Sequence, residues 1–327
     1  MSADTPATGD APAARTDGPA GAGAGAESVA PVLPGTDAPI ADGELVVLTD
    51  RKGRRYLVTL RSGDEWHSHG GLVAHDEIIG SPEGVSVHTS KGMEVTALRP
   101  TRDEFVLKMK RGAQVVYTKD QAMIVALGDV RPGCTVVEAG AGSGALTLAL
   151  LAAVGQSGQV VSFEHREDHA RIARRNVTRF HGGEPTNWEL VVDDVTAALS
   201  TRTAHRVVLD LLEPWDVVAA TAEALPPGGI VVAYTPGVPQ VMRFTDTLWA
   251  DGRFTDVRTS ETLVRPWDVD GLAVRPAHRM VAHTAFLTTA RRVPRRADGG
   301  PARRRRKADT GGSVDWGATD DLRVAGS

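Results

Sequence analysis

The middle of the chain repeats one pattern, in which a short apolar run is followed by a turn and a longer segment. The apolar runs predict five strands, at residues 135–139, 159–165, 188–195, 205–212 and 230–236. The intervening segments predict helices at residues 145–155, 166–180 and 217–225. Strands that alternate with helices form a mostly parallel sheet covered on both faces, so we expect an α/β, Rossmann-like fold.

Two later segments, 254–269 and 283–292, are strand-like and have no full helix between them. They predict an antiparallel hairpin at one edge of the sheet. Before the sheet, residues 43–50 and 54–61 predict two strands around a tight turn in which Gly53 can adopt a positive φ. We therefore expect a small all-β domain over residues 41–107, followed by the parallel-sheet domain over residues 108–292.

The two ends differ in composition from the rest of the chain. Residues 1–40 hold almost no large apolar side chain, and residues 293–327 are basic, with RRRRK at 303–307. Such segments bury too little apolar surface to offset the entropy lost on ordering, so both tails are predicted to be disordered. No secretory signal pattern is present at the start. The longest apolar run, residues 145–155, is about half of the roughly 20 residues that a membrane span needs.

Composition narrows the functional classes only slightly. The single cysteine, Cys134, excludes an internal disulfide and fits a cytoplasmic protein. The net charge of −4 does not by itself indicate nucleic-acid binding. Residues 51–55 (RKGRR), residues 108–111 and the basic tail are nevertheless positive patches that could contact a phosphate backbone.

A glycine-rich turn stands between the first strand and its helix. Gly140, Gly142 and Gly144 allow close approach of a ligand to the backbone, next to the electropositive helix N-terminus. With Ala145 the turn also fits the dinucleotide fingerprint, and Glu164, 20 residues beyond Gly144, suits a ribose diol. The turn therefore predicts an adenosine-containing cofactor, either NAD or S-adenosylmethionine.

The ends of the first four predicted strands favour the second cofactor. Each carries an acid: Glu138, Glu164, the pair Asp193 and Asp194, and Asp210. Ligands of parallel sheets gather at the carboxyl ends of the strands. An acidic rim would repel the diphosphate of NAD but suits the sulfonium and ammonium groups of S-adenosylmethionine. Asp193 or Asp194 could accept a hydrogen bond from the adenine amino group.

Two further interpretations are weaker. Ser143 with Asp210 and His283 has the chain order of a hydrolase triad, but alanines replace the two glycines of the G-x-S-x-G elbow. Four histidines near the N-terminus invite a zinc interpretation, but no cysteine lies nearby and we predict no metal site. The four are His67, His69, His75 and His88.

Several longer segments resemble the bacterial and archaeal tRNA (adenine-N1)-methyltransferases, over roughly residues 43–292. The segments that carry the resemblance are HSHGGLVAHDEIIG, ALRPTRDEFVL, RGAQVVYTKDQAMIV, VVEAGAGSGALTLAL, FEHREDHARIARRNV, LDLLEPWDVV, PPGG and GLAVRPAHRMVAHTAFL. One departure is Thr118, which stands where many members have a proline in Tyr-Pro-Lys-Asp.

The resemblance implies a class I S-adenosylmethionine-dependent methyltransferase fold behind a small β domain. It implies methyl transfer to N1 of adenine 58 in the T-loop of tRNA, by a homotetramer. Tyr117 and Asp210 match active-site positions, and Asp210 is expected to border the cofactor as well. The matched cofactor-binding positions are Ser143, Gly144, Ala145, Leu146, Glu164, His169, Asp193 and Asp194.

The chemistry gives Asp210 a specific role. Methylation of N1 makes the adenine ring cationic, so a carboxylate at the exocyclic amino group forms a hydrogen bond that strengthens in the transition state. Since the target adenine is buried in folded tRNA, it must be extruded. Arg51, Lys52, Arg54, Arg55 and residues 108–111 are predicted to hold tRNA phosphates. An NAD-dependent oxidoreductase and a catalytically silent tRNA-binding subunit remain the alternatives.

Overall fold

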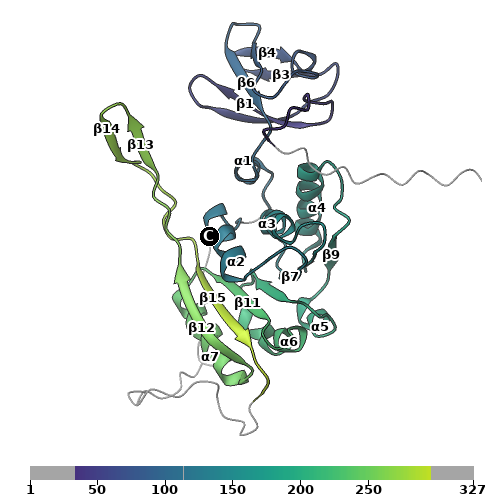
Figure 1. Ribbon diagram of the computed structural model, residues 1–327, viewed down its shortest axis with the longest axis vertical. Helices are drawn as coiled ribbons and strands as arrows, with labels where there is room; N and C mark the ends of the chain where they lie inside the picture. The colour runs from purple at the N-terminus through teal and green to yellow at the C-terminus, as the bar shows by residue number, and fades with distance from the viewer. Residues whose placement is uncertain (1–33, 113, 296–327) are drawn as a thin grey trace, which may run out of the picture.

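The structure is a computed structural model that describes residues 34–112 and 114–295. The RRRRK segment, and most of the two predicted disordered tails, lie outside the described residues. Figure 1 shows two separate sheets along the long axis of the molecule, joined by helix α1 (Arg102–Lys108). None of the helices in the described ranges combines the length and apolar character needed to cross a lipid bilayer.

The N-terminal sheet has four antiparallel strands in the order β2-β1-β6-β5. These are β1 (Leu45–Asp50), β2 (Arg55–Thr59), β5 (Ser86–His88) and β6 (Glu94–Leu98), accompanied by the hairpin β3 (Glu65–Ser68) and β4 (Gly71–Ala74) and by the short 3-10 helix η1 (His75–Glu77). The predicted turn between β1 and β2 is confirmed, with Gly53 at φ 74°. The strands enclose a core of their own, formed by Ile40, Val46, Leu48, Leu60, Val73, Ile78, Val87, Val95 and Ala97.

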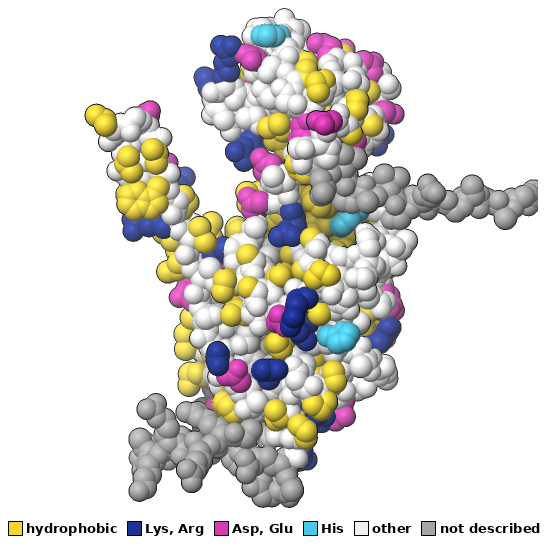
Figure 2. Space-filling view, viewed as in Figure 1, with side chains coloured by type: hydrophobic (Ala, Val, Ile, Leu, Met, Phe, Trp, Pro, Cys, Tyr) yellow, Lys and Arg dark blue, Asp and Glu magenta, His cyan; other side chains and the backbone are white. Residues whose placement is uncertain are grey.

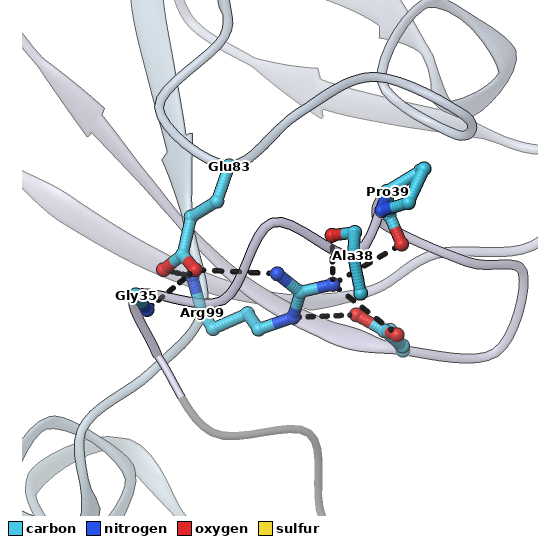
Figure 3. A network of polar contacts seen from close by, with 6 residues as sticks. Gly35, Ala38, Pro39, Glu83 and Arg99 are labelled. Carbon is cyan, nitrogen blue, oxygen red and sulfur yellow. Dashed lines mark hydrogen bonds and ion pairs between the residues drawn. The ribbon is translucent and has the colours of Figure 1, made fainter.

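Arg99 fastens the entering chain to this sheet (Figure 3). Its side chain is only 2% exposed and forms ion pairs with Glu44 and Glu83. Its guanidinium also donates to the backbone carbonyls of Ala38 and Pro39. The neighbouring Ile40 is fully buried. Packed structure therefore begins before residue 41, and the prediction of disorder up to residue 40 is wrong for the last few residues of that range.

The second sheet has seven strands in the order β12-β15-β11-β10-β7-β8-β9. Its parallel strands are β7 (Thr135–Ala139), β8 (Gln159–Glu164), β9 (Trp188–Val192), β10 (Arg206–Leu209) and β11 (Ile230–Thr235). The antiparallel strands β12 (Phe254–Glu261) and β15 (Phe286–Arg292) complete one edge. The predicted mostly parallel sheet with an antiparallel edge is confirmed.

Helices cover both faces of this sheet. One face packs against α1, α2 (Thr118–Leu127), α3 (Ala145–Val154) and α4 (Glu167–His181). The other packs against α5 (Val195–Leu199), α6 (Val218–Ala224) and α7 (Val238–Asp251), with η2 (Pro214–Val217) before α6. Consecutive strand residues point to opposite faces, so Val136 and Val137 belong to the two different cores. The apolar pattern of the sequence does not predict α1, α2, α5 and α7.

A two-stranded arm, formed by β13 (Trp267–Asp270) and β14 (Ala273–Pro276), interrupts the predicted edge hairpin. Residues 262–266 and 277–285 form the stem of the arm, which connects it to β12 and β15. The arm projects from this stem away from the body of the molecule (Figure 1). Trp267 pairs with Pro276, and Val269 pairs with Val274, so one face of the arm is apolar. Trp267, Val269 and Val274 are exposed and Pro276 is partly buried, and Figure 2 shows hydrophobic side chains gathered on the arm.

Replacing Arg99 with methionine tests whether it holds the N-terminal sheet together. Arg99→Met leaves Glu44 and Glu83 without their buried partner, so we expect a loss of about 3–5 kcal/mol in the free energy of unfolding of this region. Urea unfolding, monitored by limited proteolysis, measures this loss in the free energy of unfolding. Arg51→Met is the control, because the 82% exposed Arg51 pairs with Glu94 in solvent and should change stability by about 0–1 kcal/mol. Equal effects of the two changes would contradict this role.

Candidate active site

The glycine turn is closed by hydrogen bonds to the end of β8. The amides of Gly140 and Ala141 both donate to the Phe163 carbonyl, each at 3.0 Å. The amide of Gly142 donates to the Glu164 carboxylate at 2.9 Å. All three glycines of the turn have positive φ, the region in which side chains are disfavoured. The turn is therefore a fixed loop at the carboxyl end of the sheet.

Gly140 and Asp210 lie in direct backbone contact. The Asp210 amide donates to the Ala139 carbonyl at 2.8 Å, which extends the β7–β10 pairing by one residue. A Cβ at position 140 would lie 2.2 Å from the Asp210 carbonyl oxygen, so only glycine fits. A Cβ on Gly142 would meet nothing within 4 Å, which leaves its outer side open. The turn thus places Asp210 beside an accessible backbone surface.

A pocket of about 240 Å³ opens next to this contact. It is lined by Gly140, Phe163, Glu164, His165, Asp193, Asp194, Val195 and Leu211. Four predicted cofactor residues, Gly140, Glu164, Asp193 and Asp194, therefore meet in one pocket although they come from three separate segments of the chain. Asp193 and Asp194 are exposed, and Asp194 also caps α5 by accepting from the Thr196 amide.

Three carboxyl groups interact electrostatically at this edge of the sheet. Burial, and then the charge of Glu164, raise the pKa of Asp210 to about 7. Burial raises the pKa of Glu138 to about 8, with smaller contributions from Asp210 and Glu164 and opposing hydrogen bonds from Ser162 and Thr147. A raised carboxyl pKa means that negative charge is costly there. A cationic ligand would relieve that cost.

The predicted acidic rim needs two corrections, because neither Asp210 nor Glu138 is among the residues that line this pocket. Glu138 is fully buried inside β7 and accepts hydrogen bonds from the Thr147 and Ser162 hydroxyls. It therefore lies behind the pocket and does not border it. Trp188 also donates to the Ser162 hydroxyl, so this polar network runs under the glycine turn.

Other predicted residues occupy different positions around the turn. The side chains of Ala145 and Leu146 belong to the hydrophobic core, so only their backbone could face a ligand. The Ser143 hydroxyl is buried and accepts from the Gly112 amide at 3.2 Å. His169 on α4 is half-buried and lies against the same glycine, outside the pocket lining. A segment from before α2 thus crosses the glycine turn.

The second predicted active-site residue, Tyr117, is half-buried at the N-cap of α2. Tyr234, the penultimate residue of β11, is a further candidate site residue that the sequence pattern does not single out. Its hydroxyl is buried, and the Thr284 side chain lies near enough to oppose part of the rise in its pKa. Burial raises the pKa of Tyr234, and the nearby charges of Asp120 and Asp210 add to the increase. Its position near the carboxyl end of β11, the strand adjacent to β10, is the available signal.

The weaker alternatives do not match the geometry. His283 contacts the Glu261 carboxylate and the Pro236 carbonyl, and it forms no hydrogen bond with Ser143 or Asp210 within the described ranges. A dinucleotide diphosphate would need the loop amides, but Gly140, Ala141 and Gly142 already donate theirs within the protein. Across residues 34–112 and 114–295, no group of three or more His, Cys, Asp or Glu side chains could hold a metal ion.

The positive patch at residues 51–55 is largely neutralised. Arg51, Arg54 and Arg55 form ion pairs with Glu94, Asp50 and Glu104, respectively. Lys52 is exposed and has no ion pair in the part of the chain that the structure describes. A phosphate would therefore have to compete with these acids for three of the four side chains.

S-adenosylmethionine fits the residues that are present. The pocket contains no basic side chain apart from His165, whereas Glu164, Asp193 and Asp194 supply oxygens for hydroxyl, amino and ammonium groups. Gly142 leaves open space at the turn. S-adenosylmethionine, which is cationic and has no phosphate, therefore matches the acidic lining and the open space at the turn better than NAD does.

Two family models match the chain. Residues 39–87 match a TrmI-like N-terminal region, and residues 94–274 match the tRNA methyltransferase complex GCD14 subunit. A tRNA (adenine(58)-N(1))-methyltransferase TrmI from Thermus thermophilus is 40% identical over 247 residues, which are 76% of this chain and 96% of that protein. A tRNA (adenine(57)-N(1)/adenine(58)-N(1))-methyltransferase TrmI from Methanocaldococcus jannaschii is 31% identical, covering 77% and 96%.

Two solved structures agree with the fold. A SAM-dependent O-methyltransferase from Thermotoga maritima superimposes with a TM-score of 0.74 and 31% identity, covering 79% of this chain and 96% of that one. A tRNA (m1A58) methyltransferase TrmI from Aquifex aeolicus gives 0.67 and 28%, covering 79% and 100%.

The buried Glu138 makes a prediction about pH-dependent stability. Its pKa in the folded protein, about 8, lies above its ordinary value of 4.5, so the folded state binds a proton that the unfolded state releases. Stability from this group is therefore present below pH 4.5 and is lost as the pH rises towards 8. Glu138→Gln keeps the hydrogen-bonding shape without the charge. We expect a flatter dependence of the melting temperature on pH between about 5 and 8, with Glu184→Gln, an exposed acid, as control. An unchanged slope would contradict it.

Proposed function

The chain belongs to the TrmI-like family of tRNA methyltransferases, and from this premise we propose that it methylates N1 of adenine 58 in the T-loop of tRNA. The observation that carries the proposal is the backbone contact that places Asp210 beside the glycine turn. Tyr234 is close enough to interact electrostatically with Asp210, and Tyr117 is close enough to interact with Tyr234. The methyl donor would be S-adenosylmethionine. When bound, it supplies a methyl group already activated on a sulfonium.

Glycine-turn and pocket residues would hold the donor. We assign to this role Gly140, Gly142, Ser143, Gly144, the backbone of Ala145 and Leu146, Glu164, Asp193 and Asp194. His169 would act only through the segment that it supports at Gly112. The carboxylates around the pocket attract a cation and disfavour a phosphate, which is the physical basis of the choice of donor.

Asp210 would orient the acceptor base and stabilise its developing charge. Its carboxylate accepts no hydrogen bond from the described residues, so its oxygens are available to an adenine amino group. Because N1 becomes cationic during the reaction, the hydrogen bond from that amino group to Asp210 strengthens in the transition state. The neutral Tyr234 hydroxyl and Tyr117 would line the same acceptor space.

We also propose that the protein works as a homotetramer and that the arm contributes to assembly. An isolated two-stranded hairpin is only marginally stable in water, yet this arm exposes Trp267, Val269 and Val274 on one face. A contact that covers this face would stabilise it. A cytoplasmic location, expected for a tRNA-modifying enzyme with a single cysteine, stays a prediction.

The test of this function is analysis of the product. Unmodified tRNA incubated with the purified protein and labelled S-adenosylmethionine should yield 1-methyladenosine, located at position 58. A tRNA with adenine 58 replaced by guanine is the control and should take up little label. Label in another nucleoside would refute the proposal. Binding of tRNA without turnover until a second polypeptide is added would favour the silent-subunit alternative.

Asp210→Asn should lower kcat about 10²–10³-fold, because the neutral asparagine side chain accepts the hydrogen bond from the adenine amino group more weakly than the charged carboxylate does. The wild-type kcat/KM for tRNA should rise with pH and level off above about 7, since only deprotonated Asp210 acts. Steady-state kinetics from pH 5.5 to 8.5 measure both. Asp193→Asn, by comparison, should mainly raise the KM for S-adenosylmethionine. Lost cofactor affinity in Asp210→Asn with normal residual turnover would contradict the assignment.

A further inference from the structure

Lys119 is buried in a polar network that methyl transfer itself does not require. Its side chain is 7% exposed, and it pairs with Asp120, whose side chain is fully buried, at 2.8 Å. The ammonium also donates to the Thr262 carbonyl at 2.8 Å and to the Thr284 hydroxyl at 2.6 Å. The Thr284 hydroxyl in turn donates to Asp120 at 2.6 Å. All three ammonium protons and both carboxylate oxygens are thus in use.

These contacts join three segments that are far apart in sequence. Lys119 and Asp120 are in the first turn of α2, and the amides of Asp120 and Gln121 donate to the carbonyl of Tyr117. Thr262 directly follows β12 and Thr284 shortly precedes β15, so they are on the two sides of the stem that carries the arm. The network therefore fixes the α2 N-terminus, where Tyr117 stands, against the stem.

The network also lies close to the acceptor side of the site. The charge of Asp120 helps to raise the pKa of Tyr234, and Tyr117 contributes to the same shift. A second contact ties the stem to the end of Tyr234's own strand, where His283 bridges Glu261 and the Pro236 carbonyl. Movement at the stem would thus change the positions of both tyrosines.

A buried ion pair is weak evidence for stability, because desolvation of both charges offsets their attraction. Such a pair instead fixes the relative positions of the segments that carry it, because its buried donors and acceptors must stay within hydrogen-bonding distance of one another. The network has no spare hydrogen-bonding group through which Lys119 could contact substrate. Its contribution to the reaction must therefore pass through the residues that it holds.

We propose that Lys119 is a positioning residue for methyl transfer, which holds Tyr117 against the acceptor adenine by anchoring α2 to the stem of the arm through Asp120 and Thr284. This proposal rests on the proposed function. It predicts that loss of the Lys119 contacts lowers turnover and leaves donor binding intact, because the pocket at β7, β8 and β9 contains none of these residues.

The experiment is a double-mutant cycle between positions 119 and 117, measured on tRNA that the wild-type protein methylates. Lys119→Met should lower kcat at least tenfold with the KM for S-adenosylmethionine within about twofold of wild type. Lys119→Arg should recover part of the loss. If Lys119 acts through Tyr117, Lys119→Met should have little further effect in a Tyr117→Phe background. Losses that multiply across the cycle, or no recovery with arginine, would overturn the proposal.

Thr284→Val provides a second route that leaves no charge unpaired, and the same cycle is run with it if Lys119→Met does not fold. It should lower kcat severalfold. Its matched control is Thr288→Val, which removes a buried hydroxyl on β15 whose side-chain hydrogen bond in the described structure is to Thr259, at 2.9 Å. Equal kcat losses in the two valine variants would overturn the proposal. Failure of the wild-type protein to form 1-methyladenosine would instead refute the proposed function.

Discussion

The backbone contact between Gly140 and Asp210 is the constraint on which the rest of the site depends. Two neighbouring parallel strands, β7 and β10, end side by side, and their last hydrogen bond brings the Asp210 carbonyl to a distance at which no Cβ fits on residue 140. In the proposed reaction, the same contact sets the donor side next to the acceptor side. A methyl group moves only a short distance between donor and acceptor, so this proximity is a requirement of the chemistry.

The electrostatics of the site follow from where the acids are buried. Asp210 and Glu138 are costly to ionise in the protein alone, as their raised pKa values show. The Ser162 and Thr147 hydroxyls donate hydrogen bonds to the Glu138 carboxyl group, and Trp188 donates to the Ser162 hydroxyl. Among the described residues, no cation pairs with this carboxyl group. A pocket of this kind favours a positively charged ligand over a phosphate, which supports the proposal of S-adenosylmethionine over NAD as the cofactor.

The polar networks away from the pocket share one function, which is to fix segments that are distant in sequence. Arg99 joins the entering chain to the N-terminal sheet, and Lys119 with Asp120 joins α2 to the stem of the arm. In both networks nearly every hydrogen-bond donor of the central Arg99 or Lys119 side chain is used, and both of these side chains are buried. Such networks hold a geometry that apolar packing alone would leave less defined.

The sequence by itself determined the local features. The alternation of apolar runs and helices defined the parallel sheet, the glycines defined the turn, and the motifs around Tyr117 and Asp210 identified the family. These features are local because side-chain periodicity and turn conformation depend on neighbouring residues. Only the tertiary structure decided that Glu138 is buried behind the pocket, that the Tyr234 hydroxyl is buried near the charges of Asp120 and Asp210, and that the RKGRR side chains are mostly paired. It also decided that Ile40 is core and that Lys119 reaches Thr262 and Thr284. Burial and pairing depend on contacts between residues far apart in the chain, which strand order and helix packing create.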